Sequence, residues 1–280
     1  MSAIQSFQGL YCVVGFAVGF LVGLTGVGGG SLMTPILILL FGVHPAVAVG
    51  TDLLYAAATK SVGALVHGYN RTVDWRVVRR LAAGSVPMTA LTIWALSFVN
   101  INSAPARELI TGALTVALLA TAVTLVFRDR IVTRYAMRIE GLSAPRIAAR
   151  TVGVGAILGV LVSISSVGAG AIGVTALLVL YPRLPTARIV GSDIAHAVPL
   201  TLAGGIGHWF LGSINFDVLA SLLVGSMPGI LIGSLIVARL PERVLRLALA
   251  VVLIMVATKL GLDLSASSSP SVEITAIHTR

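Results

Sequence analysis

The stretch Gly26-Val27-Gly28-Gly29-Gly30-Ser31 interrupts an apolar run in which no Asp, Glu, Lys or Arg occurs from Met1 to Thr51. Glycine lowers helix stability and widens the range of backbone conformations, so the stretch predicts a bend between two helical arms. A bend without nearby charge is expected near membrane depth, where irregular backbone persists only if protein buries it or water lines it. A second bend of this kind, Ser165-Ser166-Val167-Gly168-Ala169-Gly170, lies inside another uncharged run, from Thr151 to Pro182.

The composition places the rest of the chain in the bilayer as well. Of its 280 residues, 57% are hydrophobic and 10% are charged, and the mean hydropathy is +1.01, whereas a soluble domain carries about 25% charged residues. The net charge of +9 suits the cytoplasmic loops of a membrane protein and not a nucleic-acid partner. The single cysteine excludes a disulfide framework or a cysteine metal site. We therefore expect an all-α polytopic membrane protein, without a cleavable signal peptide because its N-terminus lacks basic residues.

The apolar segments fall into two similar halves. Each half is predicted to begin with a glycine-bent hairpin, whose two arms are of similar length and short for a ~30 Å hydrocarbon core. Three longer transmembrane helices follow in each half. The predicted hairpins cover 8–43 and 151–182, and the longer spans lie near 46–68, 81–98 and 108–127, then near 187–211, 217–239 and 244–262. We expect four regions: a first transmembrane repeat at 1–127, an arginine-rich cytoplasmic connector at 128–150, a second repeat at 151–262, and a polar, disordered tail at 263–280.

The two halves are also related residue by residue, at offsets of 140 and then 141 positions. Matches of this number and order indicate an internal duplication. Glycines four residues apart within it, such as Gly15 and Gly19, favour close helix packing. Gly15, Gly19, Leu21, Val22, Val27, Gly28 and Gly30 recur as Gly155, Gly159, Leu161, Val162, Val167, Gly168 and Gly170; Gly50-Thr51-Asp52 as Gly191-Ser192-Asp193; His67 as His208; and Gly84-Ser85-Val86-Pro87 as Gly225-Ser226-Met227-Pro228.

The positive charges predict how the halves are oriented. Most of the 19 Lys and Arg residues lie in four segments, at 71–80, 128–150, 183–188 and 239–246. If each hairpin returns to the side it left, these segments share one face, which the positive-inside rule makes cytoplasmic, with both termini outside. The repeats then have inverted topology, as in secondary transporters whose binding sites lie near the midplane at broken helices.

Several motifs in combination resemble the TauE/SafE sulfite exporter family over roughly residues 8–262. They are Val22-Gly-Leu-Thr-Gly-Val-Gly-Gly-Gly-Ser31, Pro35, His44-Pro45-Ala46, Gly50-Thr51 and Arg71-Thr-Val-Asp-Trp75. The resemblance implies transport of small sulfur oxyanions or organosulfonates, such as sulfite or sulfoacetate. One departure is that Asp52, and again Asp193, follows the Gly-Thr or Gly-Ser pair, where the family commonly has serine. An acid beside an anion site argues against selectivity for plain sulfite.

The glycine bends are the first candidate site. Successive backbone N–H groups at a turn or helix N-terminus form an anion-binding concavity, and nearby hydroxyls add donors. The alternative is that these glycines only allow tight packing. The predicted substrate-binding residues are Thr25, Gly28, Gly29, Gly30, Ser31, Thr51, Lys60, Ser165, Ser166, Gly168, Gly170 and Ser192.

Charged residues within the predicted spans are the second candidate site. A charge at the bilayer centre costs at least ~2.5–3.5 kcal/mol on insertion scales, so it is normally paired or functional. We expect Lys60 to attract the anion and Asp52, Asp193 or His196 to carry coupling protons. The alternative for the aspartates is helix capping after Pro45 and Pro185. The predicted coupling or gating residues are Asp52, Tyr55, Asp193, His196 and His208.

These observations predict a secondary transporter of a small anion, working by alternating access in the cell membrane. The alternatives are a cation carrier using Asp52 and Asp193, or a membrane assembly or sensor protein without flux. No nucleophile–base pair, metal-ligand motif or P-loop occurs, so we expect no enzyme activity, metal or cofactor. The match of 168–173 to G-x-G-x-x-G lacks the βαβ context of a nucleotide site. The expected partners are the anion and the lipid bilayer, with a homodimer left open.

Overall fold

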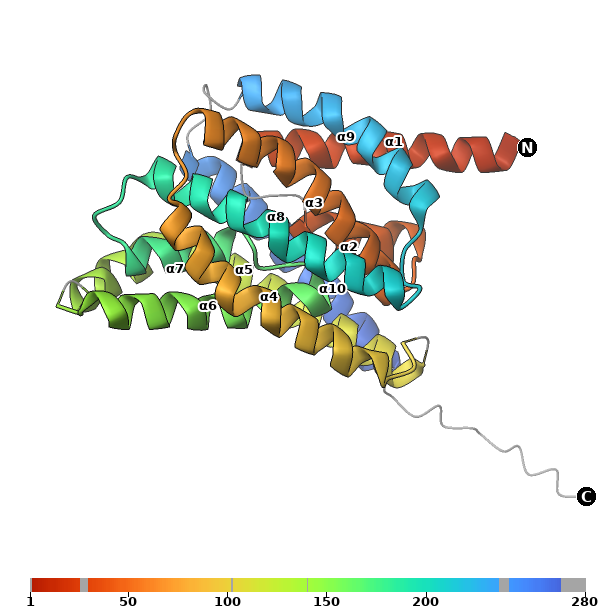
Figure 1. Cartoon of the computed structure of the whole chain (residues 1–280). Helices are drawn as coiled ribbons and strands as arrows, with labels where there is room; N and C mark the ends of the chain where they lie inside the picture. Colours follow the sequence, from red (N-terminus) through yellow and green to blue (C-terminus); the bar gives the residue numbers. More distant parts are fainter. Residues whose placement is uncertain (1, 26–29, 102, 140, 237–241, 268–280) are drawn as a thin grey trace, which may run out of the picture.

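The computed structural model describes residues 2–25, 30–101, 103–139, 141–236 and 242–267, and all regular structure in these ranges is α-helical. Figure 1 shows the helices packed side by side as an elongated bundle. This confirms the predicted all-α class. The first half contains α1 (Ser2–Thr25), α2 (Gly30–Phe41), α3 (Pro45–Tyr69), α4 (Trp75–Ser97) and α5 (Ala104–Ile139); the second contains α6 (Ala144–Ser165), α7 (Ala171–Leu180), α8 (Thr186–Phe210), α9 (Phe216–Ile236) and α10 (Glu242–Ser267).

Five of these helices are long and apolar enough to cross a membrane, within the described residues. They comprise Ala104–Ile139, Ala144–Ser165, Thr186–Phe210, Phe216–Gly233 and Arg243–Ala266, while α1, α2 and α7 hold shorter apolar stretches. The predicted spans near 46–68 and 81–98 form α3 and α4, which have 25 and 23 residues. Neither is among the five, because buried charges interrupt the sequence of α3 and arginines occupy the start of α4.

The arms of each hairpin differ in length, contrary to the expectation of equal arms. The helices α1 and α2 have 24 and 12 residues, and α6 and α7 have 22 and 10. In the second half the longer arm begins before the uncharged run, because Pro145 in its first turn suits a helix start. The arginine-bearing stretches on either side of Ser143 are therefore continuous with α5 and α6.

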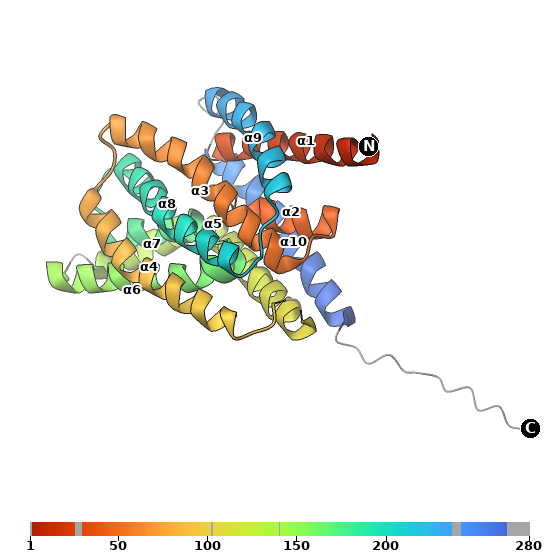
Figure 2. The same ribbon diagram turned by 45° about the vertical axis from the view of Figure 1, so that its right-hand side comes forward.

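Helices of the two halves interlock in a reciprocal pattern. The helix α1 packs along α9, and α4 packs along α6, while α3 packs on α8 and α5 on α10. Each helix of the first half has its counterpart five helices later, so α1 corresponds to α6 and α4 to α9. The α1–α9 pair is therefore the counterpart of the α6–α4 pair, and the α3–α8 and α5–α10 pairs are each their own counterpart. Figures 1 and 2 both show α9 crossing α1 on one side of the bundle and α4 lying over α6 on another.

Glycines permit the closest of these contacts, as their spacing predicts. A Cβ atom on Gly84 of α4 would collide with the carbonyl oxygen of Val152 on α6, and one on Gly225 of α9 would collide with the carbonyl of Cys12 on α1. The four residues are two counterpart pairs, so the duplicated sequence produces the same backbone contact twice. The predicted packing role also holds for Gly15, Gly19, Gly155 and Gly159, which meet backbone atoms of the partner helix.

The connections between helices gather at two ends of the bundle. In Figure 1 the α3–α4, α5–α6 and α7–α8 connections lie at the left end, and the α2–α3, α4–α5 and α8–α9 connections lie at the right end. The start of α1 and the end of α10 also lie at the right. Segments rich in arginine therefore share the end opposite the start of α1.

Candidate functional site

The second glycine bend lies in the middle of the bundle and receives a lysine from the first half. Helix α6 ends at a left-handed Ser166 (φ 57°), and α7 begins after Gly170 (φ 124°). The ammonium of Lys60 on α3 donates a hydrogen bond to the carbonyl of Ala169 in this bend, at 3.4 Å. Lys60 is 8% exposed. The sequence led us to expect N–H groups of the bend facing an anion, whereas the structure places one of its carbonyls against a cation.

Two buried carboxyl groups flank this lysine, one from each half. Asp52 on α3 accepts a hydrogen bond from the Thr34 hydroxyl of α2, with 2.5 Å between Oγ1 and Oδ2. Asp193 on α8 lies against Gly173 in the first turn of α7, where a side chain would collide with its Oδ1 atom. Both acids interact electrostatically with Lys60. The structure thus brings together three residues that the sequence spreads over more than 130 positions.

Tyr55 and His196 occupy counterpart positions one turn beyond the two aspartates. The Nε2 atom of His196 shares a 2.8 Å hydrogen bond with the Ser85 hydroxyl of α4. The Tyr55 hydroxyl lies near Ser226 of α9, which is the counterpart of Ser85. Each half therefore extends the central polar cluster with a ring and a serine, using an imidazole in one case and a phenol in the other.

Several polar atoms of this cluster are buried without a hydrogen-bond partner. They are Asp52 Oδ1, Asp193 Oδ1, the Tyr55 and Ser166 hydroxyls, and His196 Nδ1. An unpartnered buried polar atom is costly, and in native proteins it commonly marks an ordered water, an ion or a functional group. Their concentration around one lysine identifies the centre of the bundle as the candidate site for a polar solute.

Thr51 and Ser192, the residues before the two aspartates, make contacts between the halves. The Thr51 hydroxyl accepts a hydrogen bond from the Asn215 N–H, at 3.1 Å, and the Ser192 hydroxyl accepts one from the Asp74 N–H, at 2.8 Å. Asn215 and Asp74 directly precede α9 and α4, so each hydroxyl holds the start of a helix from the other half. We call these two contacts the hydroxyl clips.

The remaining predicted residues lie around this centre or outside the described part. Ser165 donates to Leu161 of its own helix, and His208 bonds the carbonyl of Ser163 with its Nε2 atom. Ser31 is buried in the first turn of α2. Gly28 and Gly29 lie outside the described residues; Thr25 ends α1, Gly30 begins α2, and Gly168 precedes Gly170 in the second bend.

Three residues at the centre were missed by the sequence analysis. Thr34 lies one turn after the first bend, and its hydroxyl is visible in the sequence only as one polar group in an apolar helix. Ser85 and Ser226 belong to the duplicated Gly-Ser-x-Pro segments, which the sequence analysis used only as evidence of the duplication. The signal that would have identified these serines is a hydroxyl group that recurs at counterpart positions of the two halves.

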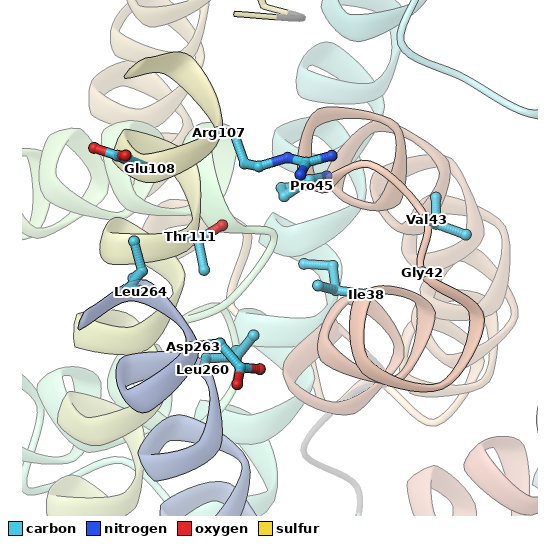
Figure 3. A pocket seen from close by; sticks show the side chains of 10 residues that line it. All are labelled: Ile38, Gly42, Val43, Pro45, Arg107, Glu108, Thr111, Leu260, Asp263 and Leu264. Carbon is cyan, nitrogen blue, oxygen red and sulfur yellow. The ribbon is translucent and has the colours of Figure 1, made fainter. Parts of the chain in front are cut away.

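A separate cavity lies at the right end of the bundle and contains none of the predicted site residues. It measures about 270 Å³ and lies between the α2–α3 turn, the start of α5 and the end of α10. Figure 3 shows Arg107 reaching across from α5 towards Pro45, with Thr111 and Ile38 facing the space between them. Arg107 lowers the pKa of the neighbouring His44 together with desolvation, which is the larger cause. This cavity offers a mixed apolar and charged lining at the surface, apart from the buried cluster.

Comparison with known proteins places the chain among membrane transporters. The family model of the sulfite exporter TauE/SafE matches residues 11–260. The chain is 37% identical to the probable membrane transporter protein YjnA of Bacillus subtilis (strain 168) over 251 residues, which are 89% of this chain and 97% of that protein. It is 25% identical to the probable membrane transporter protein YdhB of the same strain over 86% of this chain and 94% of YdhB. A probable membrane transporter protein of Xylella fastidiosa (strain 9a5c) is 24% identical over 84% of this chain and 87% of that protein. No solved structure matches the chain.

With a buried polar cluster inside a bundle of apolar helices, the chain belongs to the sulfite exporter TauE/SafE family of membrane transporters.

Proposed function

We propose that the protein is a secondary transporter of a small anion, namely sulfite, another sulfur oxyanion or an organosulfonate, and that it works by alternating access. The observation that carries this proposal is the Lys60 ammonium, buried where the second bend meets both aspartates. A buried ammonium needs a negative or strongly polar partner, and a 3.4 Å hydrogen bond to one carbonyl is a weak one. An incoming sulfonate or sulfite oxygen would replace that carbonyl with a charge-assisted hydrogen bond.

The two halves act, in this proposal, as inverted repeats around the cluster. The reciprocal packing of α1 on α9 and of α4 on α6 supports a two-fold relation between them. The gathering of the arginine-rich connections at one end supports a cytoplasmic face there, with both termini on the other side of the cell membrane. Rocking of one half against the other would expose the cluster to each side in turn.

Proton movement accompanies the anion in this proposal, carried by the buried acids or His196. Uptake of radiolabelled anion into proteoliposomes, with and without an imposed pH gradient at zero membrane potential, tests this part. We expect a faster initial rate when protons can move down their gradient with the anion. Equal rates under both conditions would remove proton coupling and leave anion transport standing.

The substrate class is tested by comparing Lys60→Ala with Lys259→Ala. Lys259 is exposed near the end of α10, so its variant controls for loss of a positive charge alone. Purified protein is first screened by thermal unfolding against sulfite, sulfate, thiosulfate and sulfonates, because a ligand that binds the folded form raises its Tm. We expect the effective anions to stabilise the wild type and Lys259→Ala and to have no effect on Lys60→Ala. Stabilisation of all three proteins by the same anions would contradict a role for Lys60.

A cation carrier is the second candidate, because two buried carboxyl groups interact electrostatically with one buried ammonium. The same variant separates the two functions. Lys60→Ala removes the repulsion of a cation, so it should preserve or increase cation flux while it abolishes anion flux. Measurement of both fluxes in the same proteoliposomes decides between them.

A further inference from the structure

The charges of the central cluster balance only if one of its acids is protonated or a cation is bound. Among the described residues, Asp52, Asp193 and Lys60 are the buried acidic and basic side chains apart from histidines. With both acids ionised, the cluster carries one excess negative charge, and an anionic substrate would add at least one more. Uncompensated charge at membrane depth is strongly disfavoured. One additional positive charge is therefore needed before an anion can bind there.

The oxygen atoms that surround Asp52 are arranged to supply a place for that charge. The Ser166 hydroxyl of the second bend faces the Asp52 carboxyl group, and the Thr34 hydroxyl bonds Oδ2. Both Ser166 Oγ and Asp52 Oδ1 are buried, and neither has a hydrogen-bond partner beyond their contact with each other. Thr34 gives its proton to the carboxylate, which leaves its oxygen lone pairs free to accept a cation. Three side chains from α2, α3 and the end of α6 thus converge as oxygen ligands.

We propose that Asp52, Ser166 and Thr34 bind one Na⁺ ion as the coupling cation, an inference that rests on the proposed anion transport for its role. Hard cations prefer oxygen ligands of this kind, and the C-terminal end of α6 adds the negative pole of its helix dipole. A single carboxylate beside the Lys60 ammonium favours a monovalent ion over a divalent one. Backbone carbonyls and water complete the coordination, as at other broken transmembrane helices.

The second half repeats the aspartate but not the two hydroxyl groups. The counterparts of Thr34 and Ser166 are Val174 and Gly26, which have no hydroxyl groups. Asp193 faces the bare backbone of Gly173 instead. Ser166 also keeps a left-handed backbone conformation that glycine adopts more easily. The hydroxyl is therefore retained at a position where the other half uses glycine, as expected if it binds the ion. One Na⁺ per chain follows, and Asp193 and His196 stay available for protons.

The test is thermal unfolding of the full-length protein in detergent, followed by tryptophan fluorescence during a NaCl titration. Choline chloride holds the ionic strength constant, and KCl is titrated in parallel. We expect a saturable rise in Tm with Na⁺ that K⁺ and choline do not produce, since a ligand specific to the folded state stabilises it. Equal shifts with all three salts, or no shift with any of them, would overturn the proposal. A shift that follows pH and not Na⁺ would assign the site to a proton and also overturn it.

Two variants locate the ion, and one matched variant serves as the control. Ser166→Gly removes the hydroxyl while it suits the left-handed backbone, so the variant should fold and lose about tenfold in apparent Na⁺ affinity. Asp52→Asn should abolish the response. Ser163→Ala on the same helix should keep it, because the Ser163 hydroxyl bonds only its own helix. An unchanged Na⁺ affinity in Ser166→Gly would disprove the assignment even if Asp52→Asn failed to fold.

Failure of this inference is distinguishable from failure of the proposed transport. Anion-dependent stabilisation and anion flux are measured separately in Na⁺-free choline buffer. Anion flux that continues at the same rate without Na⁺ refutes the coupling ion and leaves anion transport intact. An anion flux that strictly depends on Na⁺, and that requires a higher Na⁺ concentration in Ser166→Gly, supports both the coupling ion and anion transport.

Discussion

The two halves of the protein share their helix contacts and differ in part of their central polar cluster. The hydroxyl clips occur in both halves at counterpart positions, with Thr51 holding Asn215 and Ser192 holding Asp74. In the central cluster, by contrast, Lys60 corresponds to Thr201 and Tyr55 to His196. Contacts that hold the bundle together were thus kept in both copies, as were Asp52 and Asp193, whereas Lys60 and Tyr55 of the central cluster were not. The positions at which the cluster differs between the halves are therefore the first to test for function.

Substitution of Lys60 should lower activity far more than substitution of its counterpart Thr201, and this is the largest effect that we expect. Thr201 bonds a carbonyl of its own helix, so Thr201→Val should leave anion flux within about threefold of the wild type. Lys60→Ala should lower it by about 100-fold, because the anion loses a charge-assisted hydrogen bond in a buried site. The measurement is initial uptake of radiolabelled anion into proteoliposomes with matched protein content. A similar loss in both variants would mean that the halves contribute equally.

The shared glycine contacts should give the next largest effect, and it should be the same in both halves. Gly84→Ala and Gly225→Ala each force a methyl group onto a facing backbone carbonyl, which should reduce stability by about 1–3 kcal/mol. Gly112→Ala on α5, where a Cβ atom meets nothing within 4 Å, should instead be neutral or stabilise by up to ~1 kcal/mol. Denaturant unfolding in detergent gives the three values. A large difference in unfolding free energy between Gly84→Ala and Gly225→Ala would show that the two counterpart contacts stabilise the bundle unequally.

The hydroxyl clips should have a smaller effect, again similar in the two halves. Thr51→Val and Ser192→Ala each leave one backbone N–H without its acceptor, at a cost of about 1 kcal/mol. Hydrogen exchange should speed up at Asn215 in the first variant and at Asp74 in the second. Thr115→Val is the control, because its hydroxyl bonds only its own helix. Exchange that speeds up at both sites in either variant would indicate that the clips are coupled.

The surface ion pair between α5 and α10 should have the smallest effect. Hydrogen bonds from Arg246 lower the pKa of Asp129 below its usual value. A carboxyl group with a lowered pKa contributes stability above its unfolded pKa, and this contribution is lost as the pH falls through the folded value. Because the Asp129 side chain is 69% exposed, Asp129→Asn should change stability by less than about 0.5 kcal/mol at neutral pH. The difference from wild type should shrink as the pH falls below the unfolded pKa of about 3.9, which unfolding across a pH series measures. A larger loss would mean that this contact matters as much as the buried ones.

The sequence alone was informative about the helices and the duplication. Uncharged runs predicted membrane helices, because the hydropathy of a segment depends only on its own residues. Glycines that recur at counterpart positions predicted close helix contacts, because the absence of a side chain is visible directly in the sequence. Helix lengths were less predictable: α6 begins in an arginine-bearing stretch that hydropathy assigned to a connector, because Pro145 and helix propensity set its start.

What the sequence determined is therefore a duplicated, membrane-spanning helical chain with charges at unusual depth, because hydropathy, glycine spacing and charge placement are local properties. The tertiary structure decided which polar groups meet. Lys60 reaches Ala169, and Thr34 and Ser166 reach Asp52, across separations of 18 to more than 100 residues. Such partners are chosen by the packing of helices against one another, and no spacing rule along the chain encodes them. For the same reason Thr51 and Ser192, which the sequence assigned to the substrate, are found holding the ends of helices from the opposite half.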